Sequence, residues 1–223
     1  MMRRLARWHI WLGWLIAVPL LMWTITGLVM VSRPIEEVRG EHLRREFAPG
    51  TLPTNLDERL RLPSDLSQTE QLTIRIVNGA PVVLATVDGA TVRYSLDGTP
   101  LPLVSETDAR RLVAIQITGG ERQRSARLFA AGEAPLDFRR ELPVWQVTLA
   151  DGTHVYVGQQ TGAIEAVRTP FWRVFDLMWG LHIMDLSGRE DTHRPLLVLF
   201  AALAALGTLI GTALLFRRRK ARR

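Results

Sequence analysis

The 223-residue chain contains no cysteine, and Lys220 is the single lysine among its 28 basic residues. Without cysteine, the chain has no disulfide framework, no thiolate metal site and no cysteine nucleophile. It also lacks the Gly-x-Ser-x-Gly, His-Glu-x-x-His and glycine-rich phosphate-loop patterns of common enzyme families. These absences argue against an enzyme with its own active site, and we predict no catalytic residue.

Acidic residues are missing from both ends of the chain. Arg3, Arg4 and Arg7 precede the first acidic residue, and six basic residues lie within 217–223. The rest of the chain carries 19 basic and 22 acidic residues, a net charge of −3, although the whole chain has a charge of +6. Positive charge confined to short tails beside apolar segments is typical of cytoplasmic flanks. We therefore interpret the basicity as membrane topology and predict no nucleic-acid partner.

Charge is also missing from two long apolar runs, about Trp8 to Val31 and about Leu196 to Phe216. Each is longer than 18 residues, and about 20 apolar residues in a helix span a bilayer. The first run is too long for the apolar region of a signal peptide, and no Ala-x-Ala site follows it. We predict two spans in a bacterial inner membrane, both termini cytoplasmic and a central periplasmic domain.

The segment between the spans changes to a period of two near Gln71. Apolar and polar residues alternate over 73–77, 81–87 and 90–96, and these runs are joined by Asn78-Gly79 and Asp88-Gly89. Such dipeptides between alternating runs are a strong hairpin signal. The pattern predicts a three-stranded antiparallel meander.

A helix and a second β block are predicted to follow. Ser105 is predicted to cap a helix whose first turn contains acidic residues, and this helix is predicted to extend to about Ile117. Further strands are predicted at 128–130, 145–149, 154–157 and 163–167. The fold class is therefore α+β, with antiparallel β meanders and a helix forming two similar halves.

Five parts result from these patterns. We predict a tail and first transmembrane helix (1–32), a linker with a helical extension over 35–47 (33–70), the periplasmic domain (71–168), an interfacial helix and loop (169–194), and a second transmembrane helix with a basic tail (195–223). The aromatic residues of 171–179 favour the interfacial helix, since such side chains prefer the membrane–water boundary.

Several motifs resemble known ones. The run from Pro143 through Trp145 and Asp151-Gly152 to Thr161-Gly162 resembles the core of a PepSY domain, and 94–112 resembles its other half. The flanking His9-Ile10-Trp11-Leu12-Gly13, Thr26-Gly27 and Leu181-His182-Ile183-Met184-Asp185 resemble the PepSY-associated transmembrane family of bacterial envelopes. Two features depart from the family pattern: no Asp directly precedes Thr161-Gly162, and larger members have four or more spans.

The resemblance implies three functions. The first is a non-enzymatic, membrane-anchored binding or regulatory protein. The second is a haem-binding accessory subunit of an envelope redox or siderophore-iron uptake system, because larger relatives include such reductases. The third is an inhibitor of an extracytoplasmic protease, because PepSY domains occur in protease propeptides. The implied partners are membrane lipid, a second copy or other membrane subunits, and an extracytoplasmic protease.

The histidines are the candidate haem ligands: His9, His182 and His193. Two imidazoles on opposite faces of one haem are required for bis-histidine ligation. His9 and His182 are expected at opposite sides of the membrane, so His182 with His193, or a symmetry copy, would supply the pair. The alternative is that His9 anchors the first span at the headgroups and His182 caps the interfacial helix.

Asp176, Asp185 and Asp191 accompany these histidines along the chain. Carboxylates near imidazoles can bind a metal or orient a ligand. Acidic residues at a membrane edge more often cap helices or pair with arginines, here Arg173, Arg189 and Arg194. We therefore predict no metal site.

Overall fold

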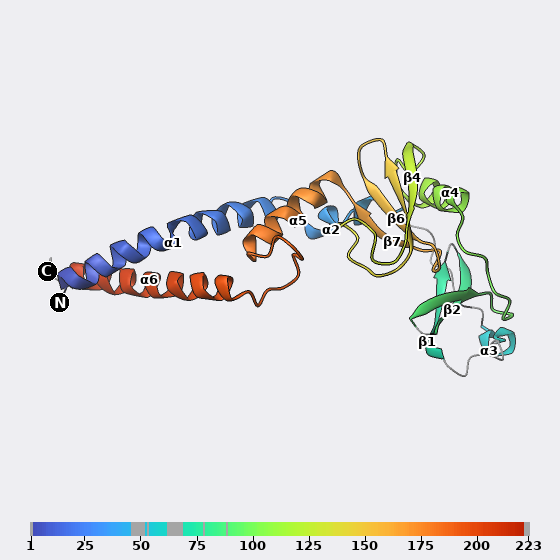
Figure 1. Ribbon diagram of the computed structural model, residues 1–223, viewed down its shortest axis with the longest axis horizontal. Helices are drawn as coiled ribbons and strands as arrows, with labels where there is room; N and C mark the ends of the chain where they lie inside the picture. Colours follow the sequence, from blue (N-terminus) through green and yellow to red (C-terminus); the bar gives the residue numbers. More distant parts are fainter. Residues whose placement is uncertain are drawn as a thin grey trace. The chain divides into compact units, whose positions relative to one another are not determined.

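The computed structural model of the chain describes residues 2–45, 52, 54–61, 69–77, 79–87 and 89–220. These residues form two compact units. Residues 1–34 and 173–223 form the helical unit, and residues 35–172 form the globular unit. Figure 1 labels most of the elements of both units.

The helical unit contains α1 (Met2–Met30) and α6 (Pro195–Lys220), together with most of α5 (Pro170–His182). The helices α1 and α6 are packed antiparallel, because Gly211 lies against His9 while Gly207 lies against Leu12 and Ile16. Figure 1 shows them side by side, with both chain ends at one end of the pair.

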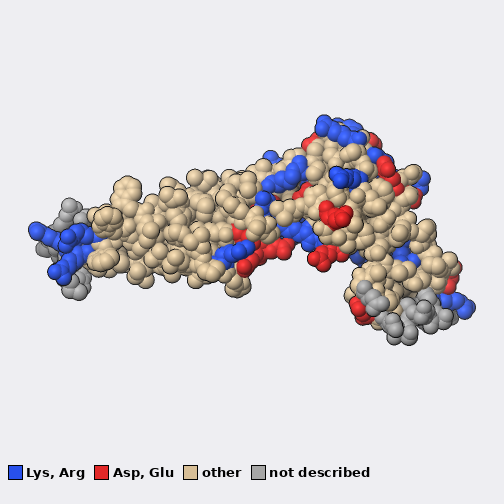
Figure 2. All heavy atoms as spheres, in the orientation of Figure 1, with Lys and Arg blue, Asp and Glu red and all other residues tan. Residues whose placement is uncertain are grey.

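Both long helices expose apolar side chains over most of their surface. Trp11 and Leu209, for example, are 73% and 69% exposed. The segments Arg3–Met30 and Pro195–Phe216 are long and apolar enough to cross a membrane, and little of either is buried within the protein. Core helices of soluble proteins bury such side chains, so these two surfaces fit a lipid environment. In Figure 2 the pair is an uncharged tan surface with blue atoms near its terminal end.

The globular unit contains two antiparallel sheets. The first has the order β1-β2-β3, formed by Thr69–Val77, Ala80–Val87 and Ala90–Tyr94. The second has the order β4-β5-β6-β7, formed by Gln123–Phe129, Val144–Leu149, His154–Gly158 and Ile164–Arg168. The predicted α+β class with antiparallel strands is therefore confirmed.

Short helices and α4 complete the globular unit. The short ones are α2 (Ile35–Val38), the 3₁₀ helix η1 (Glu41–Leu43) and α3 (Leu56–Arg59). The longer α4 covers Glu106–Gln116, and the Ser105 hydroxyl accepts a hydrogen bond from the Asp108 N–H, as the predicted cap requires.

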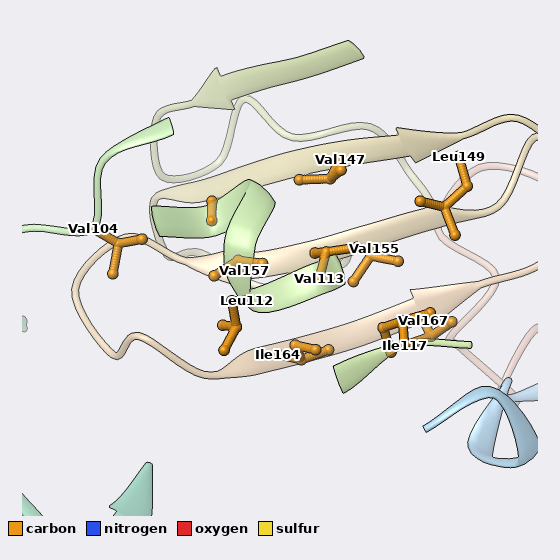
Figure 3. Packing of buried hydrophobic residues seen from close by; sticks show 11 residues of the cluster. Val104, Leu112, Val113, Ile117, Val147, Leu149, Val155, Val157, Ile164 and Val167 are labelled. Atoms are coloured by element: carbon orange, nitrogen blue, oxygen red, sulfur yellow. The ribbon is translucent and has the colours of Figure 1, made fainter. Parts of the chain in front are cut away.

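The main core lies between α4 and the four-stranded sheet. Figure 3 shows the side chains of Val113 from α4 and of Ile117 just after it, on the side of the strands that carries Val147, Val155 and Val167. The opposite face of this sheet has its own cluster around Phe138 and Tyr156. The helix thus packs on the second sheet only, whereas the three-stranded sheet has a separate small cluster of Val77, Val82 and Leu84.

The structure corrects three details of the sequence prediction. The two halves are not alike, because the core that contains α4 includes no residue of the three-stranded sheet. The helix expected over 35–47 is interrupted at Gly40, which has φ +72°, a conformation that ends a right-handed helix. The strand expected at 128–130 begins at Gln123, because its pairing with β5 reaches Leu149.

Some predicted features lie outside the described residues. Asn78 and Asp88 belong to this group, although Gly79 and Gly89 beside them have φ +80° and +74°. So do most of the linker between 46 and 68 and residues 221–223 of the basic tail.

Candidate functional site

His182 lies at the end of α5 beside the second half of α1. Its Nδ1 is 2.9 Å from the Thr26 hydroxyl, and its carbonyl accepts a hydrogen bond from Trp23 Nε1 at 2.8 Å. Gly27 lies next to the ring, since a Cβ added there would be in ordinary contact with Cε1, at 3.7 Å. The Thr-Gly motif of α1 and the Leu-His motif of α5 are therefore in direct contact.

The hydrogen bonds around Thr26 favour one tautomer of His182. The Thr26 hydroxyl donates its proton to the Met22 carbonyl at 2.7 Å. A hydroxyl has one proton to give, so when it is given to Met22 the Thr26 oxygen accepts from the Nδ1 of His182. The lone pair of the neutral imidazole then lies at Nε2, the nitrogen that is commonly offered to a metal.

His9 lies near the other end of α1 and packs against α6. A Cβ on Gly211 would lie 2.8 Å from the His9 Cε1, so the imidazole occupies the space that this glycine leaves. Its Nδ1 is buried and has no hydrogen-bond partner among the described residues. His9 and Thr26 are 17 residues apart in one helix, about 26 Å at 1.5 Å per residue.

His193 lies in the segment between α5 and α6. Its side chain is 96% exposed, and its Nδ1 is 4.0 Å from an Asp191 oxygen. None of the described contacts joins His193 to His182 or to His9. The three predicted haem ligands thus occupy three different environments.

These positions limit how haem would fit. The chain offers His182 with a free Nε2 and, at the opposite end of α1, His9. Because the two rings are about 26 Å apart along the helix, one chain does not place them on one haem. If haem binds, His182 would hold it together with a ligand from another copy or subunit.

The aspartates near His182 are engaged in structural contacts. Asp176 is ion-paired with Arg189. Asp185, 2% exposed, accepts hydrogen bonds from Ser187 and Arg194 and from the N–H groups of the Gly188–Asp191 turn, where Gly188, Glu190 and Asp191 donate.

The pKa of Asp185 reflects two opposed effects. Burial by itself raises it, but the hydrogen bonds from Ser187 and from the backbone of Asp191, Gly188 and Glu190 outweigh burial and hold the pKa well below its ordinary value. The described residues contain no group of three His, Asp or Glu side chains suited to a metal ion.

A polar network that the sequence did not indicate lies on the face of the second sheet opposite α4. Asp137 accepts a hydrogen bond from Tyr156 at 2.5 Å and contacts His154 Nδ1 at 2.8 Å. Gln146 contacts the Tyr156 hydroxyl at 2.6 Å. Burial and the hydrogen bond to Asp137 raise the pKa of Tyr156. Asp137 lies outside any strand, so alternation could not place it there.

A second unpredicted feature is a groove of about 660 Å³ on the globular unit. Most of its charged lining consists of arginines from three separate segments, residues 39–44, the loop before β5, and β7. Trp172 closes one side, and the Arg168 guanidinium lies 4.4 Å from the centre of its ring. No sequence motif joins these segments, since only the fold brings them together.

We compared the chain with known families, curated proteins and solved structures. No curated protein and no solved structure matches it. The family model described as the PepSY-associated TM region matches residues 2–223. That range includes both apolar helices, the two sheets and the contact between the Thr-Gly and Leu-His motifs. The chain is therefore a member of the PepSY-associated TM region family, a membrane-associated PepSY-domain protein.

Proposed function

We propose that the chain is a membrane-anchored binding and regulatory module of the bacterial cell envelope, with no reaction of its own. The observation that carries this proposal is the antiparallel packing of α1 and α6. The contacts of Gly211 with His9 and of Gly207 with Leu12 place the last part of α6 beside the first part of α1. If both helices span the bilayer, residues 31–194 lie on one side.

The distribution of charge along the chain supports an extracytoplasmic position for residues 31–194. Arg3, Arg4 and Arg7 precede the first apolar run, and six basic residues follow the second, with no acidic residue among them. Short basic flanks are retained in the cytoplasm. The globular unit would then face the periplasm of an inner-membrane protein.

Binding rather than catalysis is supported by how the polar groups are used. The buried carboxylate of Asp137 is held by Tyr156 and His154, and that of Asp185 by the turn that follows it. Both carboxylates thus have partners within the fold, as buried polar groups that stabilise structure usually do.

Cysteine labelling tests the topology directly, because the wild-type chain has no cysteine. Three single-cysteine variants are compared in intact cells with a membrane-impermeant maleimide. Ala131→Cys lies on an exposed turn of the globular unit, a cysteine added after Arg223 marks the tail, and Ala205→Cys lies within α6.

We expect labelling of Ala131→Cys in intact cells, of the added cysteine only after lysis, and of Ala205→Cys only after denaturation. Labelling of the tail in intact cells, with Ala131→Cys protected, would reverse the orientation. Labelling of Ala205→Cys without denaturation would show that α6 does not lie in lipid. Cross-linking from Ala131→Cys would also capture a second copy or an extracytoplasmic protease, the predicted partners.

A second candidate function is haem binding as an accessory subunit of an envelope redox or iron-uptake system. The hydrogen bond between Thr26 and His182 supports it, because it leaves Nε2 of His182 free. Haem would supply electron transfer when bound. His182 would hold one axial position, and a second copy or another subunit would hold the other.

An absorption spectrum of the detergent-purified, haem-loaded chain tests this candidate. We expect a Soret band that is lost in His182→Ala and kept in His193→Ala, because the His193 side chain is 96% exposed. Thr26→Val should shift the band, since it removes the hydroxyl that orients the ring. Absence of a Soret band in the wild type would refute haem binding, and so would an unchanged band in His182→Ala.

A further inference from the structure

The arginine groove of the globular unit is built from segments that are far apart in sequence. Its charged lining comes from Arg39, Glu41, Arg44, Arg140, Glu165 and Arg168. All of these residues belong to the globular unit. The groove is therefore the same whichever way the chain is oriented in the membrane.

Gly40 brings one wall of the groove against β7. It has φ +72°, and a Cβ at this position would lie 2.7 Å from the Val167 Cγ1. The segment 39–44 therefore approaches the strand more closely than any other residue at position 40 permits. The guanidinium of Arg44 reaches the carbonyl of Ile164, with N–O distances of 3.4 and 3.3 Å. This wall is thus fixed to the strand by packing and by hydrogen bonds.

The groove carries more positive charge than its carboxylates balance. Four arginines face two glutamates, an excess of two positive charges. Both oxygens of Glu165 have a partner: one pairs with Arg140 at 2.6 Å, and the other accepts from the Thr161 hydroxyl at 2.6 Å. Glu41 is the remaining carboxylate of the lining.

Mutual repulsion accompanies this excess. Burial lowers the pKa of Arg168, the nearby Asp137 and Tyr156 oppose that effect, and the positive charges of Arg140 and Arg139 lower the pKa further. An anion placed among these guanidinium groups would offset both the burial and the repulsion.

We propose that this groove binds a phosphate group, carried either by a soluble molecule or by a lipid headgroup. Guanidinium groups from different elements offer planar forks of N–H donors that match the several oxygens of a phosphate. A phosphate monoester with two negative charges neutralises the excess, and a phosphodiester headgroup with one negative charge neutralises half of it. Trp172, stacked under Arg168, provides an apolar side for the organic part of the ligand.

Titration calorimetry of the full chain in a maltoside detergent, which contains no phosphate, tests the proposal. The soluble probe is glycerol 3-phosphate. The lipid probe is phosphatidylglycerol in mixed micelles of the same detergent. The test variant is Arg39→Gln with Arg44→Gln. Its matched control is Arg124→Gln with Arg127→Gln, which removes the same charge from exposed positions on β4.

We expect the test variant to weaken binding by about tenfold or more, since each lost hydrogen bond to a charged group costs roughly that much. The control should bind within about twofold of the wild type, and binding should weaken as salt rises. Arg39→Gln alone separates lost binding from lost folding, because the Arg39 side chain is exposed and does not contribute to the core. The unfolding temperature of this variant is measured in parallel.

Each outcome decides the proposal. Binding of glycerol 3-phosphate that depends on Arg39 and Arg44 supports a soluble ligand, and binding of phosphatidylglycerol alone with the same dependence supports a lipid headgroup. Binding that the test variant leaves unchanged overturns the proposal. Binding of neither probe overturns the proposal. Equal weakening in the test and control variants also overturns it, because net charge rather than the groove would then be responsible.

Discussion

Tyr156 is among the largest side chains that the described part of the globular unit buries completely. Its ring is stacked on Phe138 with centroids 4.6 Å apart. Its hydroxyl donates to Asp137 and contacts Gln146. A buried hydroxyl with two partners stabilises the fold only while both partners stay in place.

Replacing Tyr156 with Phe should therefore lower the free energy of unfolding by about 1–3 kcal/mol, because the buried Asp137 loses a donor. Thermal unfolding followed by circular dichroism measures the effect. Tyr94→Phe is the matched control, since the structure describes no hydrogen bond from the Tyr94 hydroxyl. Equal loss in both variants would show that the ring hydroxyl at position 156 has no special role.

The lowered pKa of Asp185 predicts that the stability of the folded protein depends on pH. The pKa of its carboxyl is lower in the folded protein than the ordinary value of 3.8. Its stabilising contribution is therefore fully present above about pH 4 and is lost as the pH falls below that value.

We expect the unfolding temperature of the wild type to fall below about pH 4 more steeply than that of Asp185→Asn. At neutral pH the variant should already be less stable, because an amide cannot accept hydrogen bonds on both sides from Ser187, Arg194 and the turn N–H groups. Parallel pH profiles for the two proteins would contradict this assignment.

At the scale of elements, the contact between α1 and α6 depends on small residues. Without a hydrophobic driving force between lipid-facing helices, close packing requires glycine or alanine at the interface. Gly207 and Gly211 provide it opposite Ile16 and His9. A Cβ added to Gly13, by contrast, would meet no atom within 4 Å, so this glycine faces open space.

Gly211→Leu should destabilise the helix pair by about 1–3 kcal/mol, because the added side chain collides with the His9 ring. Gly13→Leu adds the same side chain to the outer surface of α1 and should have little effect. Unfolding of the pair by titration with sodium dodecyl sulfate distinguishes the two variants. Equal stability of both would mean that α1 and α6 do not pack through Gly211.

The elements of the globular unit differ in how far the sequence could predict them. The hairpins of the first sheet and the Ser105 cap of α4 were predicted from local signals and are confirmed. The break at Gly40 was not predicted, because its cause is the close approach of Val167, a residue distant in sequence.

At the scale of the whole molecule, the distribution of charge is expected to set the orientation in the membrane. The basic tails flank the apolar helices, while the rest of the chain has a net charge of −3. A positive flank resists transfer across the membrane, whereas a long acidic segment is carried across with little regard to its charge.

Replacing all nine basic tail residues with Gln should convert a single orientation into a mixture. Labelling of Ala131→Cys in intact cells measures the fraction of chains with each orientation. Replacing Arg122, Arg124 and Arg127 of the globular unit removes positive charge elsewhere and should leave the labelling unchanged. A single orientation in the nine-residue variant would show that other features of the chain direct insertion.

The sequence by itself determined the two apolar helices, the antiparallel strands, the α4 cap and the family, because each depends on composition or on patterns between near neighbours. Only the tertiary structure decided that His182 contacts Thr26, that His9 fills the space left by Gly211, and that Asp137 joins Tyr156 and His154. The arginine groove also belongs to this second group. Its residues have no common spacing, and the close approach of chain segments at Gly40 brings them together.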